Sequence, residues 1–220
     1  MESYAPPPKA SFEWRELRVE SGQPVVTLIS RHLEPLRGLR QVLRAWPLVH
    51  EQRADAKLVI VGMEESGGYG VEAAASDSHL TDALEALEVA PEQAHIHVLG
   101  VLPHQQMVEL LQCSACHMAL SYPYTLSWSN LEALACGAPV VTNLGSPLSH
   151  ELTDGTSGLF CEYNDVRGLA EAILGCLNTP ELRQRLSEGG RALAEQRFSQ
   201  RAVFHCYEEL LNELHPARTA

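Results

Sequence analysis

Short apolar runs without polar alternation recur along this chain, and each is followed by a segment with helical spacing. The clearest runs are VVTLIS at Val25–Ser30 and KLVIVG at Lys57–Gly62. A strand that is covered on both faces has such a run, whereas a half-exposed strand alternates apolar and polar residues. Strands that alternate with helices build a parallel sheet with helices on both faces. We therefore predict an α/β fold with a doubly wound parallel sheet.

The predicted elements follow one another from residue 25 to residue 214. Strands are predicted at Val25–Ser30, Lys57–Gly62, His95–Gly100, His117–Tyr122, Pro139–Asn143 and Gly158–Glu162. Helices are predicted at about Leu39–His50, Leu80–Leu87, His104–Leu111, Asn130–Cys136, Asp165–Leu177, Pro180–Glu195 and Gln200–Leu214. Residues 1–23 are expected to form a leader or linker ahead of one domain that covers residues 24–215.

Composition excludes several classes of partner. The 220 residues contain 16 Lys and Arg against 28 Asp and Glu, a formal net charge of −12. An acidic balance argues against nucleic-acid backbones and anionic membrane surfaces as main partners. The first residues have no basic start followed by an apolar run, and no stretch approaches the roughly 18 apolar residues of a membrane span. We therefore expect a cytoplasmic protein with reduced cysteines and no transmembrane segment.

The loop after the first predicted strand carries two arginines, Arg31 and Arg37, in the stretch SRHLEPLRG. In a doubly wound sheet, ligands bind outside the carboxyl ends of the strands, where this loop is expected to lie. Two guanidiniums at a loop–helix junction suit a phosphate or diphosphate through charge-assisted contacts. For this loop taken alone, a solvated surface pair is an equally good interpretation.

A second loop leads into a short helix within LSWSNLEALACGAPVV. Ser127, Ser129 and Asn130 are expected to cap this helix, whose free N–H groups would form an anion site at the strand ends. Glu132 follows one turn inside the helix, where its carboxylate could accept hydrogen bonds from a ribose diol. Taken alone, Glu132 is more often one exposed helical carboxylate among many.

With these loops in order, the chain resembles the C-terminal, donor-binding domain of a family 4 glycosyltransferase of the GT-B fold. The resemblance runs from about Val25 to Leu214 and includes HVLGVLPHQQMVELLQ, LSWSNLEALACGAPVVTNLGSP and DGTSGLF. It implies one Rossmann-like half of a GT-B fold with extra C-terminal helices. It also implies a nucleotide-sugar donor as substrate and a retaining, metal-independent transfer of the sugar to an acceptor, with no cofactor.

The resemblance also implies roles for individual residues. Arg31 and Arg37 match the two basic residues that hold the donor diphosphate, and they are the catalytic candidates. Glu132 matches the second glutamate of the paired-glutamate motif, which binds the nucleotide ribose. The further donor-binding candidates are Gly100 and Val101 at the nucleobase edge, and Ser127, Trp128 and Ser129, whose backbone would meet the phosphates.

One position departs from the family pattern. The first glutamate of the pair should lie eight residues before Glu132, where this chain has Tyr124. In the family that carboxylate contacts the donor sugar, whereas a tyrosine can donate a hydrogen bond or stack but carries no charge at neutral pH. Tyr124 is a donor-binding candidate, and a non-catalytic nucleotide-sugar-binding or regulatory module is the alternative to an enzyme.

A complete GT-B enzyme has a second, N-terminal domain that binds the acceptor. The resemblance begins about 25 residues from Met1, so we expect that domain to be absent from these 220 residues. It is expected either to be a partner on another chain or to have been separated from this domain by truncation. The isolated chain is then expected to bind the donor but to be slow or inactive in transfer.

Two other patterns suggest metal chemistry and are disfavoured. Cys113-Ser-Ala-Cys116-His117 matches the haem-attachment string CxxCH, but the chain has no export signal and the string spans a helix–strand junction. His95 and His97 would share one face of a strand, but no third ligand follows at metal-binding spacing. We predict packing roles for both sets and no metal site.

Overall fold

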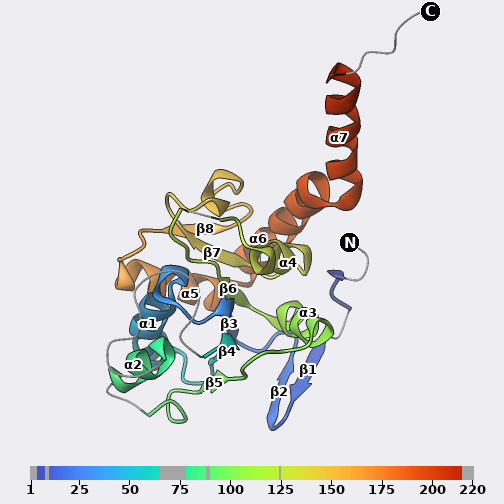
Figure 1. The fold of residues 1–220 in the computed structure, drawn as a ribbon. Helices are drawn as coiled ribbons and strands as arrows, with labels where there is room; N and C mark the ends of the chain where they lie inside the picture. The colour runs from blue at the N-terminus through green and yellow to red at the C-terminus, as the bar shows by residue number, and fades with distance from the viewer. Residues whose placement is uncertain (1–3, 8–9, 65–77, 88–89, 124, 215–220) are drawn as a thin grey trace, which may run out of the picture.

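The fold is built around one six-stranded parallel sheet. The computed structural model describes residues 4–7, 10–64, 78–87, 90–123 and 125–214. The strands have the spatial order β5-β4-β3-β6-β7-β8, and every neighbouring pair is parallel (Figure 1). This confirms the doubly wound α/β fold. Their bounds are β3 Val25–His32, β4 Lys57–Met63, β5 Ile96–Val98, β6 Cys116–Met118, β7 Val140–Asn143 and β8 Leu159–Cys161.

The uninterrupted apolar runs have a direct structural reason. Successive side chains of a strand point to opposite faces of the sheet, and here both faces are cores. In β4, Leu58 and Ile60 belong to one hydrophobic cluster, whereas Val59 and Val61 belong to the other. No polar alternation is possible on a strand of this kind, because neither face meets water.

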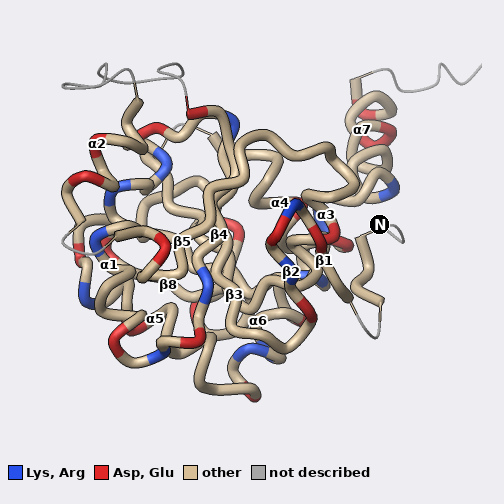
Figure 2. The backbone as a smooth tube through the Cα atoms, turned by 90° about the horizontal axis from the view of Figure 1, so that it is seen from below, with Lys and Arg blue, Asp and Glu red and all other residues tan. Residues whose placement is uncertain are grey.

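Helices cover each face of the sheet. One face packs against α1 (Leu39–Gln52), α2 (His79–Glu85) and α5 (Val166–Asn178). The other packs against α3 (His104–Cys113) and α4 (Trp128–Ala135). Figure 2 shows acidic and basic positions interspersed along α1 and α5.

A hairpin forms where the sequence analysis expected only a leader. Strands β1 (Ser11–Trp14) and β2 (Leu17–Glu20) pair antiparallel, and Phe12 and Val19 are buried against α3. Residues 11–20 therefore belong to the domain core, which corrects the expected leader over residues 1–23. SFEW and LRVE alternate exposed and buried residues, as strands with one buried face do, but each run has only four residues.

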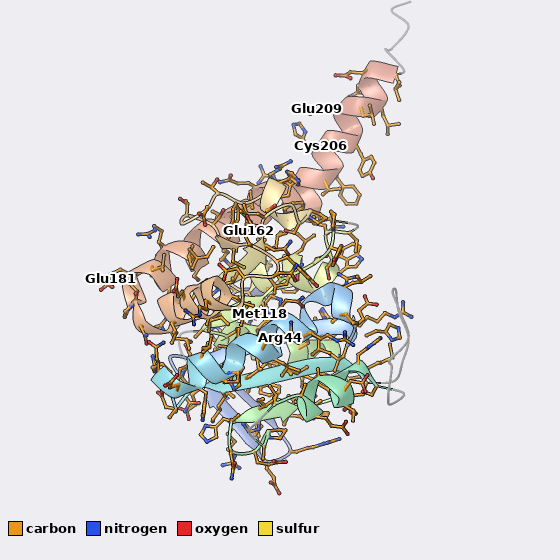
Figure 3. All side chains as sticks on the ribbon, turned by 90° about the vertical axis from the view of Figure 1, so that its left-hand side faces the viewer. Arg44, Met118, Glu162, Glu181, Cys206 and Glu209 are labelled. Atoms are coloured by element: carbon orange, nitrogen blue, oxygen red, sulfur yellow. The ribbon has the colours of Figure 1, made fainter. Side chains whose placement is uncertain are left out.

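The C-terminal helices are present as predicted, but the last one leaves the domain. Helix α6 (Pro180–Leu193) passes into a π-helical turn at Ala194–Phe198, and α7 (Gln200–Leu214) follows. No residue of α7 is buried, and the helix projects from the domain in Figure 1. Figure 3 shows Cys206 and Glu209 on this projecting helix, apart from the body of the domain. Of the helices in the described ranges, none is both long and apolar enough to cross a membrane.

Candidate functional site

A cavity of about 420 Å³ opens where β3, β4 and α4 approach one another. It lies at the carboxyl ends of the strands, close to the point between β3 and β6 where the strand order reverses. Ligands of doubly wound folds bind at this place. Seven of the nine predicted site residues line the cavity: Arg31, Arg37, Val101, Ser127, Trp128, Ser129 and Glu132.

The other two predicted residues have different outcomes. Gly100 adjoins the lining residue Val101, and its carbonyl oxygen accepts a hydrogen bond of 3.0 Å from the backbone N–H of Gly62. Gly62 itself lines the cavity at the end of β4. Tyr124 lies outside the described residues.

Gly62 allows the ends of β3 and β4 to lie close together at the cavity. Its φ is +157°, and a β-carbon added there would lie 2.3 Å from the carbonyl oxygen of Ser30. Any side chain would therefore separate the two strand ends. The register between β3 and β4 also shifts here, between Ile29 and His32. Arg31 lies inside this irregular segment and is exposed.

Arg37 is held by a tight turn and by a buried carboxylate. The 3-10 turn Pro35–Arg37 ends at Gly38, whose φ is +77°. A β-carbon on Gly38 would lie 2.4 Å from Cβ of Leu120, so only glycine allows the turn to lie this close. Nε of Arg37 lies 3.4 Å from Oε1 of Glu34, which is buried. Arg31, by contrast, forms no ion pair within the described ranges.

The first turn of α4 faces the cavity, but its predicted caps do not cap it. The helix begins at Trp128, two residues before the predicted start, and Ser127 in the N-cap position forms no capping hydrogen bond. Oγ of Ser127 instead lies 3.0 Å from Oγ of Ser129, and Nδ2 of Asn130 donates to the carbonyl of Leu126. Among the residues that the structure describes, no side chain accepts a hydrogen bond from the first-turn N–H groups of α4, and such groups bind anions.

The carboxylate of Glu132 is tied to two residues that the sequence analysis missed. Its Oε1 lies 2.6 Å from Nε2 of His104 and accepts a hydrogen bond of 3.3 Å from the Tyr4 hydroxyl. The rings of Tyr4 and His104 form a T-shaped pair with centroids 6.2 Å apart. Burial and the negative charge of Glu132 raise the pKa of Tyr4. No local pattern could reveal these ties, since the partners lie 28 and 128 positions from Glu132.

The CxxCH string is part of the core. Cys113, Cys116 and His117 are all buried, and Nδ1 of His117 lies 2.9 Å from Oγ1 of Thr27. Burial lowers the pKa of His117 to about 4, and burial raises the pKa of Cys113 to about 11. A neutral histidine and protonated thiols in a packed interior favour the packing interpretation over haem attachment or redox chemistry.

The histidine pair is arranged differently from the prediction. His95 precedes β5 with a φ of +51°, so it does not share a strand face with His97. Its ring packs against the ring of His50 instead, with centroids 5.2 Å apart. Within the part of the chain that the structure describes, no three His, Cys, Asp or Glu residues gather into a metal site.

The cavity combines three kinds of surface. Arg31, Arg37 and the start of α4 offer positive charge and N–H donors, which suit a diphosphate. Glu132 offers a carboxylate that suits a diol, and Val101 and Leu102 offer apolar surface that suits a flat ring. A volume in the range of small-molecule sites, with a few convergent polar groups, is typical of a ligand pocket.

Comparison with known proteins gives a consistent result. The sequence profile of the family described as "Glycosyl transferases group 1" matches residues 11–193. A GDP-mannose-dependent monoacylated alpha-(1-6)-phosphatidylinositol monomannoside mannosyltransferase of Corynebacterium glutamicum is 29% identical over 202 residues, which are 89% of this chain and 49% of that protein. The chain spans about half the length of the curated relatives it matches.

Solved structures share the fold at low sequence identity. Anabaena Alr3699/HepE, solved in complex with UDP and glucose, has a TM-score of 0.69 and 20% identity over 87% of this chain and 49% of its own. The C-terminal domain of a glycosyl transferase group 1 family protein from Francisella tularensis has a TM-score of 0.65 and 16% identity, over 80% of this chain and 87% of its own.

Proposed function

The chain belongs to the group 1 glycosyl transferases, and from this premise we propose that its cavity binds the nucleotide-sugar donor of a sugar transfer. The observation that carries the proposal is the convergence of Arg31, Arg37, the first turn of α4 and Glu132 on one cavity. These groups come from two parts of the chain, the stretch from the end of β3 to Gly38 and the helix α4. Together they provide groups for the diphosphate and for the ribose of such a donor.

The arginine end of the cavity is the proposed diphosphate site. Arg31 and Arg37 contribute two guanidiniums, and α4 contributes backbone N–H groups and the positive end of its dipole. When the bond between the sugar C1 and the diphosphate oxygen breaks, negative charge accumulates on the leaving nucleoside diphosphate. Groups placed in advance around this charge lower the barrier to its departure.

The opposite end is the proposed nucleoside site. Glu132 accepts hydrogen bonds from the ribose hydroxyls, and the nucleobase packs against Val101 with the main chain of Gly100 at its edge. Two comparisons support a nucleotide sugar as the ligand, since the Corynebacterium relative is named for GDP-mannose and Alr3699/HepE was solved with UDP and glucose. UDP and GDP are therefore the first nucleotides to test.

The transfer itself is proposed to be retaining and metal-independent. An acceptor hydroxyl forms the new bond to C1 on the face that the diphosphate leaves, and its proton passes to the departing diphosphate. The acceptor is proposed to be held by an N-terminal acceptor domain, as a partner of this domain. A cytoplasmic location, where nucleotide sugars are made, is part of the same proposal.

The second candidate function is a non-catalytic module that binds nucleotide sugars. Tyr124 favours it, because a tyrosine replaces the carboxylate that the family uses at the donor sugar. Both functions require the same binding site. They differ in whether the chain, supplied with an acceptor domain, transfers the sugar.

Calorimetry in the presence of EDTA tests the donor site. The 220-residue chain is titrated with UDP, GDP and ADP, and at least one is expected to bind without a divalent cation. An absence of heat with all three nucleotides contradicts the donor-site proposal. Transfer measured after an acceptor domain is added separates the enzyme from the binding module.

A further inference from the structure

His104 connects two walls of the cavity. It is the first residue of α3, directly after the segment Gly100–Pro103 that follows β5 and contributes Val101 and Leu102 to the lining. Glu132 lies on α4, on the other side of the cavity. The contact of 2.6 Å between Nε2 of His104 and Oε1 of Glu132 therefore joins the two segments.

This contact restricts a side chain that would otherwise be mobile. Glutamate has three rotatable bonds, and fixing them costs conformational entropy whenever a ligand requires one geometry. A short hydrogen bond to a carboxylate is among the stronger ones, so it can hold a rotamer before a ligand arrives. The side chain of Glu132 is 18% exposed and that of His104 is 62% exposed, which places the contact at the rim of the cavity.

Tyr4 strengthens the same arrangement. Its hydroxyl donates to the oxygen that His104 contacts, and its backbone is anchored because Nε2 of Gln112 donates to the carbonyls of Tyr4 and Ala5 at 3.2 and 3.1 Å. Oε1 of Glu132 thus has two protein partners. Oε2 accepts no hydrogen bond from the residues that the structure describes.

We propose that His104 is a positioning residue for nucleotide binding, which holds Oε1 of Glu132 so that Oε2 is directed to a ribose hydroxyl of a nucleoside diphosphate. The inference rests on the proposed function, because it assigns the ribose to Glu132. It adds a specificity determinant. His104 contacts the carboxylate of Glu132 and not the nucleotide, yet the preference for ribose over a sugar without hydroxyls is proposed to depend on it.

The test compares a nucleoside diphosphate with its 2′,3′-dideoxy form. The 220-residue chain is titrated calorimetrically with UDP, GDP and ADP, and then with the dideoxy form of the nucleotide that binds most tightly. The His104→Ala variant is expected to bind the ribonucleotide about fivefold more weakly, the effect of losing one hydrogen bond. Its affinity for the dideoxy form is expected to be unchanged, since no hydroxyl is present to be positioned.

Two variants complete the design. His104→Gln, whose amide can donate to Oε1, is expected to recover at least half of the lost affinity. His205→Ala is the matched control, because His205 lies 3.4 Å from Glu209 in a similar histidine–glutamate pair on α7, away from the cavity. This control is expected to bind both nucleotides as the wild type does.

Distinct results overturn the two proposals. If wild-type protein binds no nucleoside diphosphate, the proposed function fails, and the role of His104 fails with it. If the wild type binds and His104→Ala either matches it or weakens both nucleotides equally, only the positioning role is overturned. All titrations are made below the thermal unfolding transition of each variant, so that equal weakening of both nucleotides does not come from a loss of folded protein.

Discussion

Gly38 lies so close to Leu120 that a β-carbon on the glycine would be 2.4 Å from Cβ of the leucine. The glycine ends the turn that carries Arg37, and Leu120 follows β6. The close approach therefore places the arginine turn against the centre of the sheet. Because Gly38 has no side chain, the turn that carries Arg37 packs directly against Leu120 of the hydrophobic core.

Gly38→Ala is expected to reduce the free energy of unfolding more than Gly155→Ala does. Both glycines have a similar φ, +77° and +70°, so both variants incur backbone strain of about 1 kcal/mol. Only Gly38 meets a neighbour, which adds about 1–3 kcal/mol of overpacking. Urea unfolding of the two variants measures the difference. Equal losses would mean that Leu120 moves aside without cost.

Arg37→Ala is expected to weaken the binding of a nucleoside diphosphate by about 1.5–3 kcal/mol, the effect of losing a hydrogen bond to a charged group. The loss should shrink as salt is added, because screening weakens the contribution of charge. Arg201→Ala, which removes an exposed arginine of α7, is the control. Calorimetry at two salt concentrations measures both variants, and equal affinities for Arg37→Ala and wild type would remove Arg37 from the site.

Ser127→Gly is expected to stabilise the fold by about 1 kcal/mol. Ser127 has a φ of +63° and a ψ of 128°, a conformation that is strained for any residue with a β-carbon. Ser129→Gly is the contrasting variant, because Ser129 is helical and its hydroxyl donates to the carbonyl of Ile29 at 3.3 Å. That change should cost about 1 kcal/mol. Urea midpoints that shift in the same direction for both variants would contradict this explanation.

The stability of the fold is expected to fall as the pH falls from about 6.5 to 4. The folded pKa of His117 is about 4, below its ordinary value of 6.5, so in this window the unfolded chain binds a proton that the folded chain does not. The difference amounts to roughly 3 kcal/mol at the acid end. Urea unfolding between pH 7 and 4 measures the slope.

His117→Asn isolates this contribution. The asparagine amide can replace Nδ1 at Oγ1 of Thr27, but it does not titrate. The carboxylates are the same in both proteins, so the difference between their pH profiles reports His117. Parallel profiles for the variant and the wild type would show that His117 is protonated equally in both states.

The sequence predicted the sheet well because burial on both faces leaves a local signature. Leu58 and Val59 belong to opposite clusters, and this arrangement is visible as an unbroken apolar run. The hairpin at residues 11–20 was missed because its two strands have only four residues each, too short for a clear period. The start of α4 was predicted two residues too late, and the serine expected to cap it, Ser127, forms no capping hydrogen bond.

The candidate site was partly predictable for a related reason. Arg31 directly follows a predicted strand, and Glu132 lies near the start of the helix predicted after another strand. The carboxyl ends of parallel strands meet at one edge of the sheet, so both residues were expected at that edge. His104 and Tyr4 could not be inferred in this way, since their contacts with Glu132 depend on how α3 and the N-terminal segment pack. The role of Tyr124 stays a prediction.

Helix α7 projects from the domain, and this position limits its stability. A 15-residue helix with no buried residue gains little from packing, and isolated helices of this length are marginal in water. Its amide hydrogens should therefore exchange with solvent far faster than those of β3, whose opening requires global unfolding. Removing residues 200–220 should leave the urea midpoint of the sheet unchanged. We therefore expect the cooperative folding unit to end near Phe198, and α7 to unfold independently of it.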